Sequence, residues 1–283
     1  MAKDIRSISA KDLQSMAARQ EPMQGVNLEG ATLDGARLDG AIFTQCNFRN
    51  ASLAGASLDC AILEGSIFEG ADLTDAHLQE SRLVGADFSN ADLSRAVLIE
   101  ADLKDAVLEQ TLLIDARLSG AFLVRVQGFL ADFSGADLRR ATLSGSRLLL
   151  CNFQGAHGEL MQAMKVDFTG GLFRNANFDR AQLSGSNFSL ANLEGASLRG
   201  CPLRMANFFQ SNLVGTKFTK SIMEGAHLTD VHGEGAQING VNLRGARMID
   251  GRFLDANFDA SFLLQADTTG AQFKGASFKE ARR

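Results

Sequence analysis

The sequence lacks several residue types that most globular proteins of its length use. It has no Trp, no Tyr and only two Pro among 283 residues, although about 45% of the residues are hydrophobic. Enzymes of this length normally use Tyr or Trp as anchors with one apolar and one polar end. Compact domains also place proline in many of their loops. These absences argue against an ordinary α/β enzyme and favour a regular, repeating structure.

Charge, apolar runs and cysteines exclude further classes of protein. The 28 Lys and Arg are balanced against 33 Asp and Glu, which argues against a protein that binds nucleic acid directly. No apolar run approaches the roughly 18–20 residues of a membrane span, and Met1–Arg6 contains no hydrophobic segment of a secretory signal. The four Cys show no CxxC spacing, so we expect neither a zinc site nor a redox pair. We therefore expect a cytoplasmic protein that holds no cofactor and contacts no membrane.

A period of five residues runs through nearly the whole chain. Of the 51 positions at every fifth residue from Leu28 to Phe278, 43 are Leu or Phe, and three more are Met or Ile. The residue two places earlier is small, as at Ala31 and Cys46, and 23 of the 28 Gly fall at positions ending in 0 or 5. We number the slots of each unit 1 to 5, so that the small residue occupies slot 1, Leu or Phe slot 3 and Gly slot 5.

This period fits a square coil in which each unit forms one side. A helix repeats every 3.6 residues and a strand every 2, so neither places one residue in five on a single stripe. In a square coil, slots 1 and 3 both point inward, and stacked coils share backbone hydrogen bonds at a spacing of about 4.7–4.9 Å. A Tyr or Trp inside would leave its polar group unpaired. A proline would remove a bond between coils.

Several units resemble the consensus of a known family. Ala71–Asp75, Ala91–Arg95 and Ala256–Ala260 read Ala, Asp or Asn, Leu or Phe, and then two variable residues. They resemble the A(D/N)LXX repeat of the pentapeptide-repeat family, and the resemblance covers residues 26–283. It implies an all-β fold, the right-handed quadrilateral β-helix. At four units per coil, the 51 units make about 13 coils.

The first 25 residues lie outside the repeat. Ser9–Asp12 has the pattern of a capping box, and Leu13 and Met16 share one face of a short helix that we expect to end near Pro22. An open solenoid end exposes core side chains and unpaired backbone groups. We therefore expect an N-terminal capping helix within residues 1–25; the alternative is a helix that binds a partner.

The other end of the sequence has no comparable helix. The repeats continue to Phe278 and are followed by Glu280–Arg283. Either these charges protect the last coil edge, or a second subunit covers it. Because some pentapeptide-repeat proteins dimerise end to end, the resemblance implies a homodimer through the C-terminal coil.

Three stretches interrupt the pattern, at residues 126–130, 156–166 and 231–235. Gly occupies slot 3 at Gly128, Gly158 and Gly233. At the first stretch, Phe129 either takes over the inward position or points outward. The second is either two distorted coil sides or a loop of ten residues that projects from the coil. All three stretches are interpreted as decayed repeats. The alternative is that the stretch 156–166 contacts a partner, because loops on a rigid scaffold often carry binding.

Outward apolar residues make up the candidate protein interface. Phe129, Leu130, Leu149 and Leu150 fall on one side of adjacent coils if the period is unbroken, and contiguous exposed apolar residues often mark interaction sites. The stretch 156–166 adds further apolar side chains. The candidate residues are Phe129, Leu130, Leu149, Leu150, Leu160 and Met164.

No catalytic or metal-binding constellation is present in the pattern. The four His precede slot 3 and so point outward, and Cys46, Cys151 and Cys201 fall in slot 1, where Cys packs as a small apolar residue. The recurring Asp and Asn of slot 2 are expected to support turns rather than bind calcium. The protein is therefore not expected to be an enzyme.

Two functions remain, with an inert domain of a larger effector system as a third. The first is a scaffold or adaptor that binds a protein partner. A short helix followed directly by repeats resembles bacterial repeat proteins linked to secretion machinery, which implies such an association. The alternative is a DNA mimic that binds DNA gyrase and protects it from quinolones or toxins, as some family members do. Mimicry requires a strongly acidic surface, whereas basic and acidic residues are interleaved here.

Overall fold

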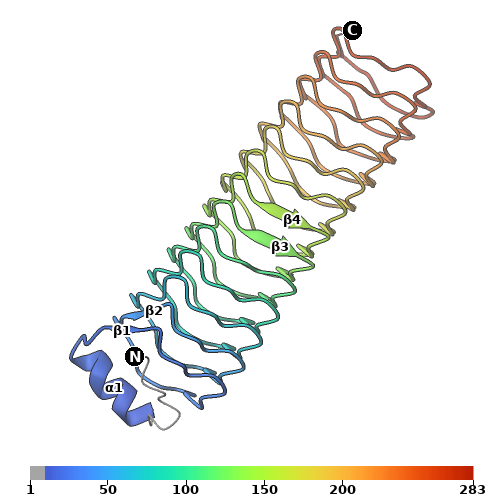
Figure 1. Ribbon diagram of the computed structural model, residues 1–283. Coiled ribbons are helices and arrows are strands. Elements are labelled where there is room, and N and C mark those ends of the chain that lie inside the picture. The colour runs from blue at the N-terminus through green and yellow to red at the C-terminus, as the bar shows by residue number, and fades with distance from the viewer. Residues whose placement is uncertain (1–9, 283) are drawn as a thin grey trace. The chain divides into compact units, whose positions relative to one another are not determined.

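The chain forms a β-helix with four sides per turn. The computed structural model describes residues 10–282, in two compact units, Met1–Thr142 and Leu143–Arg283. Parallel bridges join slot-2 residues twenty positions apart, such as Asn27 with Asn47 in the first unit and Asn187 with Asn207 in the second. Twenty residues are four pentapeptides, so each turn of either unit has four sides (Figure 1). The all-β coil expected from the period is confirmed.

Residues 10–282 contain one short helix and four short strands. The helix and strands are α1 (Ala10–Ala18), β1 (Met23–Gln24), β2 (Phe43–Thr44) and β3 (Gln127–Phe129) in the first unit, and β4 (Arg147–Leu149) in the second. β1 and β2 pair in parallel, with Met23 opposite Phe43. Elsewhere in both units, bridges of one residue alternate with turns.

Most pentapeptides repeat the same pattern of backbone hydrogen bonds. In the first coil, the Leu28 N–H donates to the Asn47 carbonyl at 2.7 Å, and the Asn47 N–H donates back to the Val26 carbonyl at 2.9 Å. The Ala31 N–H donates to the Leu28 carbonyl at 3.0 Å and closes the turn into the next side. Peptide groups inside the narrow coil cannot bond to water, and these bonds give them partners in the backbone.

Slot 5 holds the backbone in the left-handed region. Gly30 has φ of 66°, and non-glycine residues of this slot have similar positive values, such as Asn50 at 52° and Arg95 at 60°. Glycine has no Cβ and pays no steric penalty there. This conformation turns the chain from one side into the next, and it is the physical reason for the phase of the glycines.

The core consists of the side chains of slots 1 and 3. Both slots are buried in the coils that precede residue 264, except at half-buried Ala31. Phe48, Phe68 and Phe88 stack in consecutive coils at centroid distances of 4.8 and 4.9 Å, and Phe168, Phe188 and Phe208 do so in the second unit at 5.0 and 5.2 Å. The coil spacing matches the separation that offset aromatic rings favour.

Polar residues in slot 1 bond to backbone groups, in several cases those of the neighbouring coil. The Ser66 hydroxyl donates to the Phe43 carbonyl at 2.8 Å and accepts from the Cys46 N–H at 3.0 Å. Ser221 repeats this arrangement, donating to the Leu198 carbonyl at 2.6 Å and accepting from the Cys201 N–H. A hydroxyl in this slot therefore meets its hydrogen-bonding needs inside the coil.

The stretch 156–166 forms two ordinary sides of a coil. His157 and Gln162 keep their bridges to residues twenty positions later, so the alternative of an extruded loop is excluded. The departure is in side-chain size: Met161 occupies slot 1 and Ala163 slot 3, and both are fully buried. The exchange of a large and a small residue keeps the interior filled.

The slot-3 glycines make room for phenylalanine rings of the following coil. A Cβ at Gly158 would lie 2.7 Å from Phe178 Cδ1, and one at Gly233 would lie 2.8 Å from Phe253 Cδ1. The pentapeptides that contain Gly158 and Gly233 are therefore complementary in shape to the pentapeptides of the next coil, and are not decayed repeats. At Gly128 the glycine itself is buried and Phe129 is 45% exposed, so Phe129 does not replace it inside.

α1 ends earlier than the sequence suggested. Its last residue is Ala18, because Gln20 adopts a left-handed φ of 53° and the Glu21 N–H donates to the Met16 carbonyl at 3.1 Å. This is the Schellman arrangement that terminates many helices. Leu13 is fully buried, whereas Met16 is only half-buried; Ser9 of the expected capping box lies outside the described residues.

Gly233→Leu should destabilise the protein by about 1–3 kcal/mol, because the new side chain and the Phe253 ring would compete for one space. Urea unfolding followed by circular dichroism measures the change. Phe253→Ala in the same chain should recover part of the loss, and Ile238→Leu, a swap of equal volume at slot 3, is the matched control. Equal stability of Gly233→Leu and the wild type would contradict this packing.

Candidate functional site

The candidate interface residues are exposed with one exception. Phe129 and Leu130 are exposed in the first unit, and Leu150, Leu160 and Met164 are exposed in the second. Leu149 is half-buried. The outward direction predicted for slots 4 and 5 is what the structure shows.

These residues do not form a single surface in the second unit. Leu149 and Leu150 belong to the side that begins at Ser146, whereas Leu160 and Met164 follow ten or more residues later. Since one turn takes twenty residues, Leu160 lies half a turn from Leu150, and Met164, on the next side, lies about three quarters of a turn from Leu149. The second unit thus carries two separate apolar patches, and Phe129 and Leu130 form a pair within the first unit.

Further exposed apolar residues were missed by the sequence reasoning. All occupy slots 2, 4 or 5, so a survey of large apolar residues in outward slots would have found them. They are Leu112, Phe122, Leu172, Leu190, Met205, Phe262 and Leu264.

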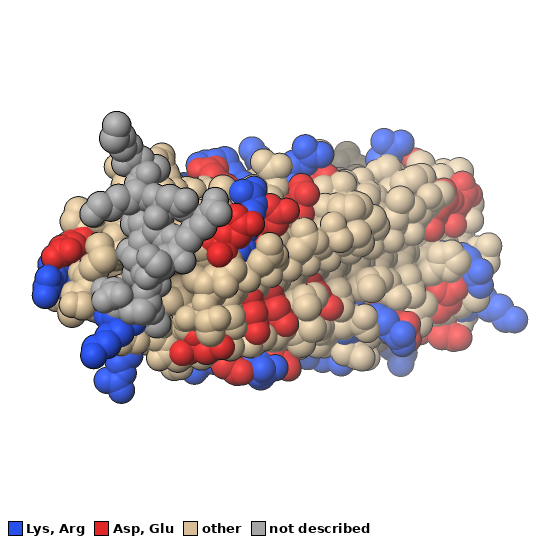
Figure 2. Space-filling view, turned by 60° about the horizontal axis from the view of Figure 1, so that its bottom comes forward, with Lys and Arg blue, Asp and Glu red and all other residues tan. Residues whose placement is uncertain are grey.

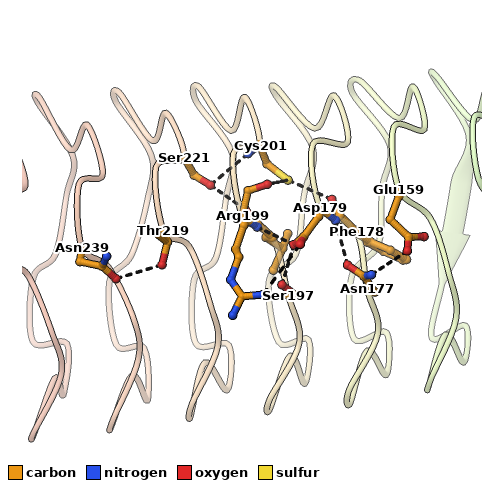
Figure 3. A network of polar contacts seen from close by, with 11 residues as sticks. Glu159, Asn177, Phe178, Asp179, Ser197, Arg199, Cys201, Thr219, Ser221 and Asn239 are labelled. Atoms are coloured by element: carbon orange, nitrogen blue, oxygen red, sulfur yellow. Dashed lines mark hydrogen bonds and ion pairs between the residues drawn. The ribbon is translucent and has the colours of Figure 1, made fainter.

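Most outward polar side chains serve turns and neighbouring coils. The Asp72 carboxylate accepts from the Thr74 N–H at 2.9 Å, and the Asn207 amide oxygen accepts from the Phe209 N–H at 3.0 Å. This is the turn-supporting role expected for slot 2. Figure 3 shows bonds between coils of the second unit, among them Asn177 Nδ2 to Glu159 Oε1 at 2.6 Å.

Two glutamates are incompletely paired. Glu159 Oε2 and Glu234 Oε2 are buried and accept no hydrogen bond, and each residue directly follows a slot-3 glycine. Their other oxygens are bonded, Glu159 Oε1 to Asn177 and Glu234 Oε1 to Arg252 Nε at 3.1 Å. Both carboxylates therefore remain anchored to the next coil.

The two units differ in the sign of their charge. Residues 26–142 contain 18 acidic and 9 basic residues, whereas residues 143–283 contain 12 acidic and 15 basic ones. In the face drawn in Figure 2, blue and red atoms are interspersed. Arg95 pairs with Asp75 at 2.7 Å, and this pairing lowers the pKa of the Asp75 carboxyl. Such exposed pairs contribute little to stability.

The cysteines are packing residues apart from Cys60. Cys46, Cys151 and Cys201 are buried and Cys60 is exposed. Burial raises the pKa of the Cys201 thiol to about 12, so hardly any thiolate exists at neutral pH. Within residues 10–282, no group of three His, Cys, Asp or Glu side chains is arranged to hold a metal ion. No helix of that same range is long and apolar enough to cross a bilayer.

The family model for pentapeptide repeats matches the chain in eight overlapping or successive copies. The matched residues are 23–59, 31–70, 51–90, 71–110, 91–126, 131–157, 164–200 and 211–248. The chain belongs to the pentapeptide-repeat family. The resemblance noted in its units is thereby confirmed.

Solved structures similar to this pentapeptide-repeat protein include other members of the family. HetL, involved in heterocyst differentiation regulation in the cyanobacterium Nostoc sp. strain PCC 7120, is 26% identical over 97% of this chain and 94% of its own, with a TM-score of 0.34. QnrB1, a plasmid-mediated fluoroquinolone resistance protein, is 18% identical over 80% and 88%, with a TM-score of 0.31. A pentapeptide repeat protein from the Arabidopsis thaliana thylakoid lumen is 30% identical over 43% and 70%, at 0.26. No curated protein sequence matches this one.

A thiol reagent such as DTNB at pH 8 should label about one of the four cysteines in the folded protein, because only the Cys60 side chain is exposed. Absorbance at 412 nm follows the reaction, and guanidinium should release the other three thiols. The variant Cys60→Ser should show no fast phase. Rapid labelling of that variant without denaturant would contradict the buried positions.

Proposed function

We propose that this pentapeptide-repeat protein is a non-enzymatic scaffold that binds a protein partner through outward apolar side chains. The observation that carries the proposal is the exposure of large apolar residues in slots that the fold leaves to solvent, Leu150 and Leu160 among them at 47% each. Isolated exposed leucines are common, but here large apolar residues recur in the outward slots of several coils, on more than one side of the surface. Such a surface suits a partner better than a small substrate.

The contacts proposed for this partner are the candidate interface residues. Phe129 and Leu130 provide them in the first unit. In the second unit, the two patches around Leu150 and around Leu160 provide them. A cytoplasmic location and an association with bacterial secretion machinery belong to the same proposal. The location is proposed from the cysteine pattern, and the association from a short helix followed directly by repeats.

The charge distribution favours this scaffold over a DNA mimic. A mimic of B-DNA presents negative charge along its whole length. The repeats from residue 143 onward carry more basic than acidic residues, and Arg95 and Arg125 neutralise carboxylates of the preceding coil in the first unit.

We also infer that α1 caps the first coil and that the coils are right-handed. The helix lies across the blue end of the first unit in Figure 1, with Leu13 and Ala17 buried. Burial of that face removes apolar surface from water and covers an edge of unpaired backbone groups. Right-handed winding is the preference of parallel strands joined by crossovers.

An end-to-end homodimer through the C-terminal coil is part of the proposal. Thr268 takes the place of the usual Leu or Phe in slot 3 and is exposed, and the inward rings of Phe273 and Phe278 are only half-buried. With Leu263 and Ala266 these residues line a cavity of about 230 Å³. A second copy would bury this apolar surface.

Affinity capture with the full-length protein should retain a partner from a bacterial cytosol, identified by mass spectrometry. Leu149→Ser with Leu150→Ser, or Leu160→Ser with Met164→Ser, should reduce the amount captured about fivefold or more, because apolar anchors dominate interfaces. Leu264→Ser, an exposed residue farther along the second unit, is the matched control. Equal capture by all variants, or inhibition of gyrase supercoiling at micromolar protein, would contradict the scaffold.

Sedimentation equilibrium should report a dimer for the wild type and a monomer for Thr268→Arg, because a charge in the apolar face would remain unpaired on association. Gln265→Arg adds the same charge outside that face and should remain dimeric. A monomeric wild-type protein at all concentrations would exclude the end-to-end dimer.

A further inference from the structure

One corner of the second unit carries side chains that the fold does not require. We call it the corner ridge: it consists of the slot-5 residues of the side that begins at Ser146 and recurs every twenty residues. Their N–H groups bond to the following coil, as Leu190 does to the Phe209 carbonyl at 2.9 Å and Asp230 to the Ile249 carbonyl at 3.0 Å. The ridge residues therefore stack one coil apart, in the order Leu150, Gly170, Leu190, Gln210, Asp230, Asp250 and Gly270.

The leucines of the corner ridge strain the backbone and gain little burial in return. Leu150 and Leu190 have φ of 57° and 61°, a conformation in which bulky residues are rare and glycine is favoured. Their side chains are also exposed, Leu190 at 58%. A Cβ at Gly170 would lie 2.5 Å from Leu150 Cδ2, so Leu150 extends along the ridge over Gly170 toward Leu190. Leu172, also exposed, lies directly beyond Gly171 and widens this apolar end.

The other end of the corner ridge stacks two carboxylates. In the first unit, slot-5 Asp75 and Asp105 are each followed one coil later by an arginine that pairs with them, at 2.7 and 2.6 Å. In the ridge, Asp230 is followed in the same geometry by Asp250. The backbones of adjacent coils lie about 4.8 Å apart, and carboxylates on adjacent coils repel each other. At Asp75 and Asp105 an arginine of the next coil balances the carboxylate. At Asp230 the position of that arginine is taken by Asp250, so this pair of carboxylates favours a positively charged ligand.

An open groove connects the two ends. It has a volume of about 450 Å³, and its lining includes Leu190, Gln210, Asp230, His232, Asp250 and Arg252. Arg252 is the basic residue of this lining, and its Nε bonds to Glu234 Oε1 at 3.1 Å. The charge of Arg252 is therefore balanced by Glu234, and Asp230 and Asp250 make the groove negatively charged.

We propose that the corner ridge and its groove bind a peptide segment of a partner protein in which apolar side chains are followed by Lys or Arg. The apolar side chains would cover Leu150, Leu172 and Leu190, and the basic ones would reach Asp230 and Asp250. Five coil spacings separate Leu150 from Asp250, about 24 Å, which an extended segment of about eight residues spans. This assignment rests on the proposed scaffold function and adds the place and the chemistry of the contact.

The test begins with a phage-displayed library of random 12-residue peptides, selected on the full-length protein. Enriched peptides should combine leucine-type residues with Lys or Arg, and their affinities are measured by fluorescence anisotropy. Leu190→Gly, and Asp230→Asn with Asp250→Asn, should each weaken binding about fivefold or more. Only the pair of aspartate changes should also reduce the dependence of binding on salt.

The stability of Leu190→Gly separates a binding role from a structural one. Glycine relieves the left-handed backbone, so this variant should melt about 2–4 °C higher than the wild type while it binds less. Ala260→Gly is the matched control: it changes a slot-5 residue at φ 56° on another side of the coil and should raise the melting temperature without changing affinity. A lower melting temperature for Leu190→Gly would assign Leu190 to the fold and overturn its place in the site.

Enrichment of acidic peptides, failure to enrich any, or equal affinity of the enriched peptides for all variants would overturn the assignment. Affinity capture of a partner with the same variants shows whether only the corner ridge assignment fails or the scaffold function fails as well. A partner retained equally by wild type, Leu190→Gly and the aspartate pair would refute the corner ridge and leave the scaffold intact. A protein that captures no partner would refute the scaffold itself.

Discussion

The left-handed backbone at every fifth residue is the constraint on which the structure depends. Each slot-5 residue turns the chain into the next side, and only because these turns recur at equal spacing do peptide groups meet partners twenty positions away. The same turn directs slots 1 and 3 inward, so the core and the hydrogen-bond ladder arise from one conformation. A glycine there relieves strain, while a leucine retains it.

The interior tolerates variation because adjacent coils compensate each other. A missing side chain at Gly233 is matched by the Phe253 ring, and the exchange of sizes between Met161 and Ala163 keeps the coil filled. Close-packed interiors respond to volume rather than to the identity of one residue. The backbone therefore stays regular through stretches where the repeat consensus fails, and those stretches offer no projecting loop for a partner.

Function in such a protein is confined to the outward slots. Slot-2 Asp and Asn close their own turns, as Asp72 does with Thr74, and polar side chains between coils bond to one another, as Asn177 does with Glu159. What remains is a set of outward side chains that neither the core nor the ladder uses. A leucine in slot 5 strains the backbone, and carboxylates on adjacent coils repel each other. Neither stabilises the coil, and a role in binding would explain their presence.

The period of the sequence by itself determined the coil, its inward slots and the absence of Tyr, Trp and most proline, because these follow from spacing along the chain. It also placed Leu150 and Leu160 outward. Only the tertiary structure decided that 156–166 are coil sides, since that depends on whether Phe178 of the next coil fills the space at Gly158. Which outward residues share a side follows from that decision: one extruded pair of units would have rotated every later residue by half a turn. Contacts twenty residues apart are set by packing between coils, and no local pattern contains them.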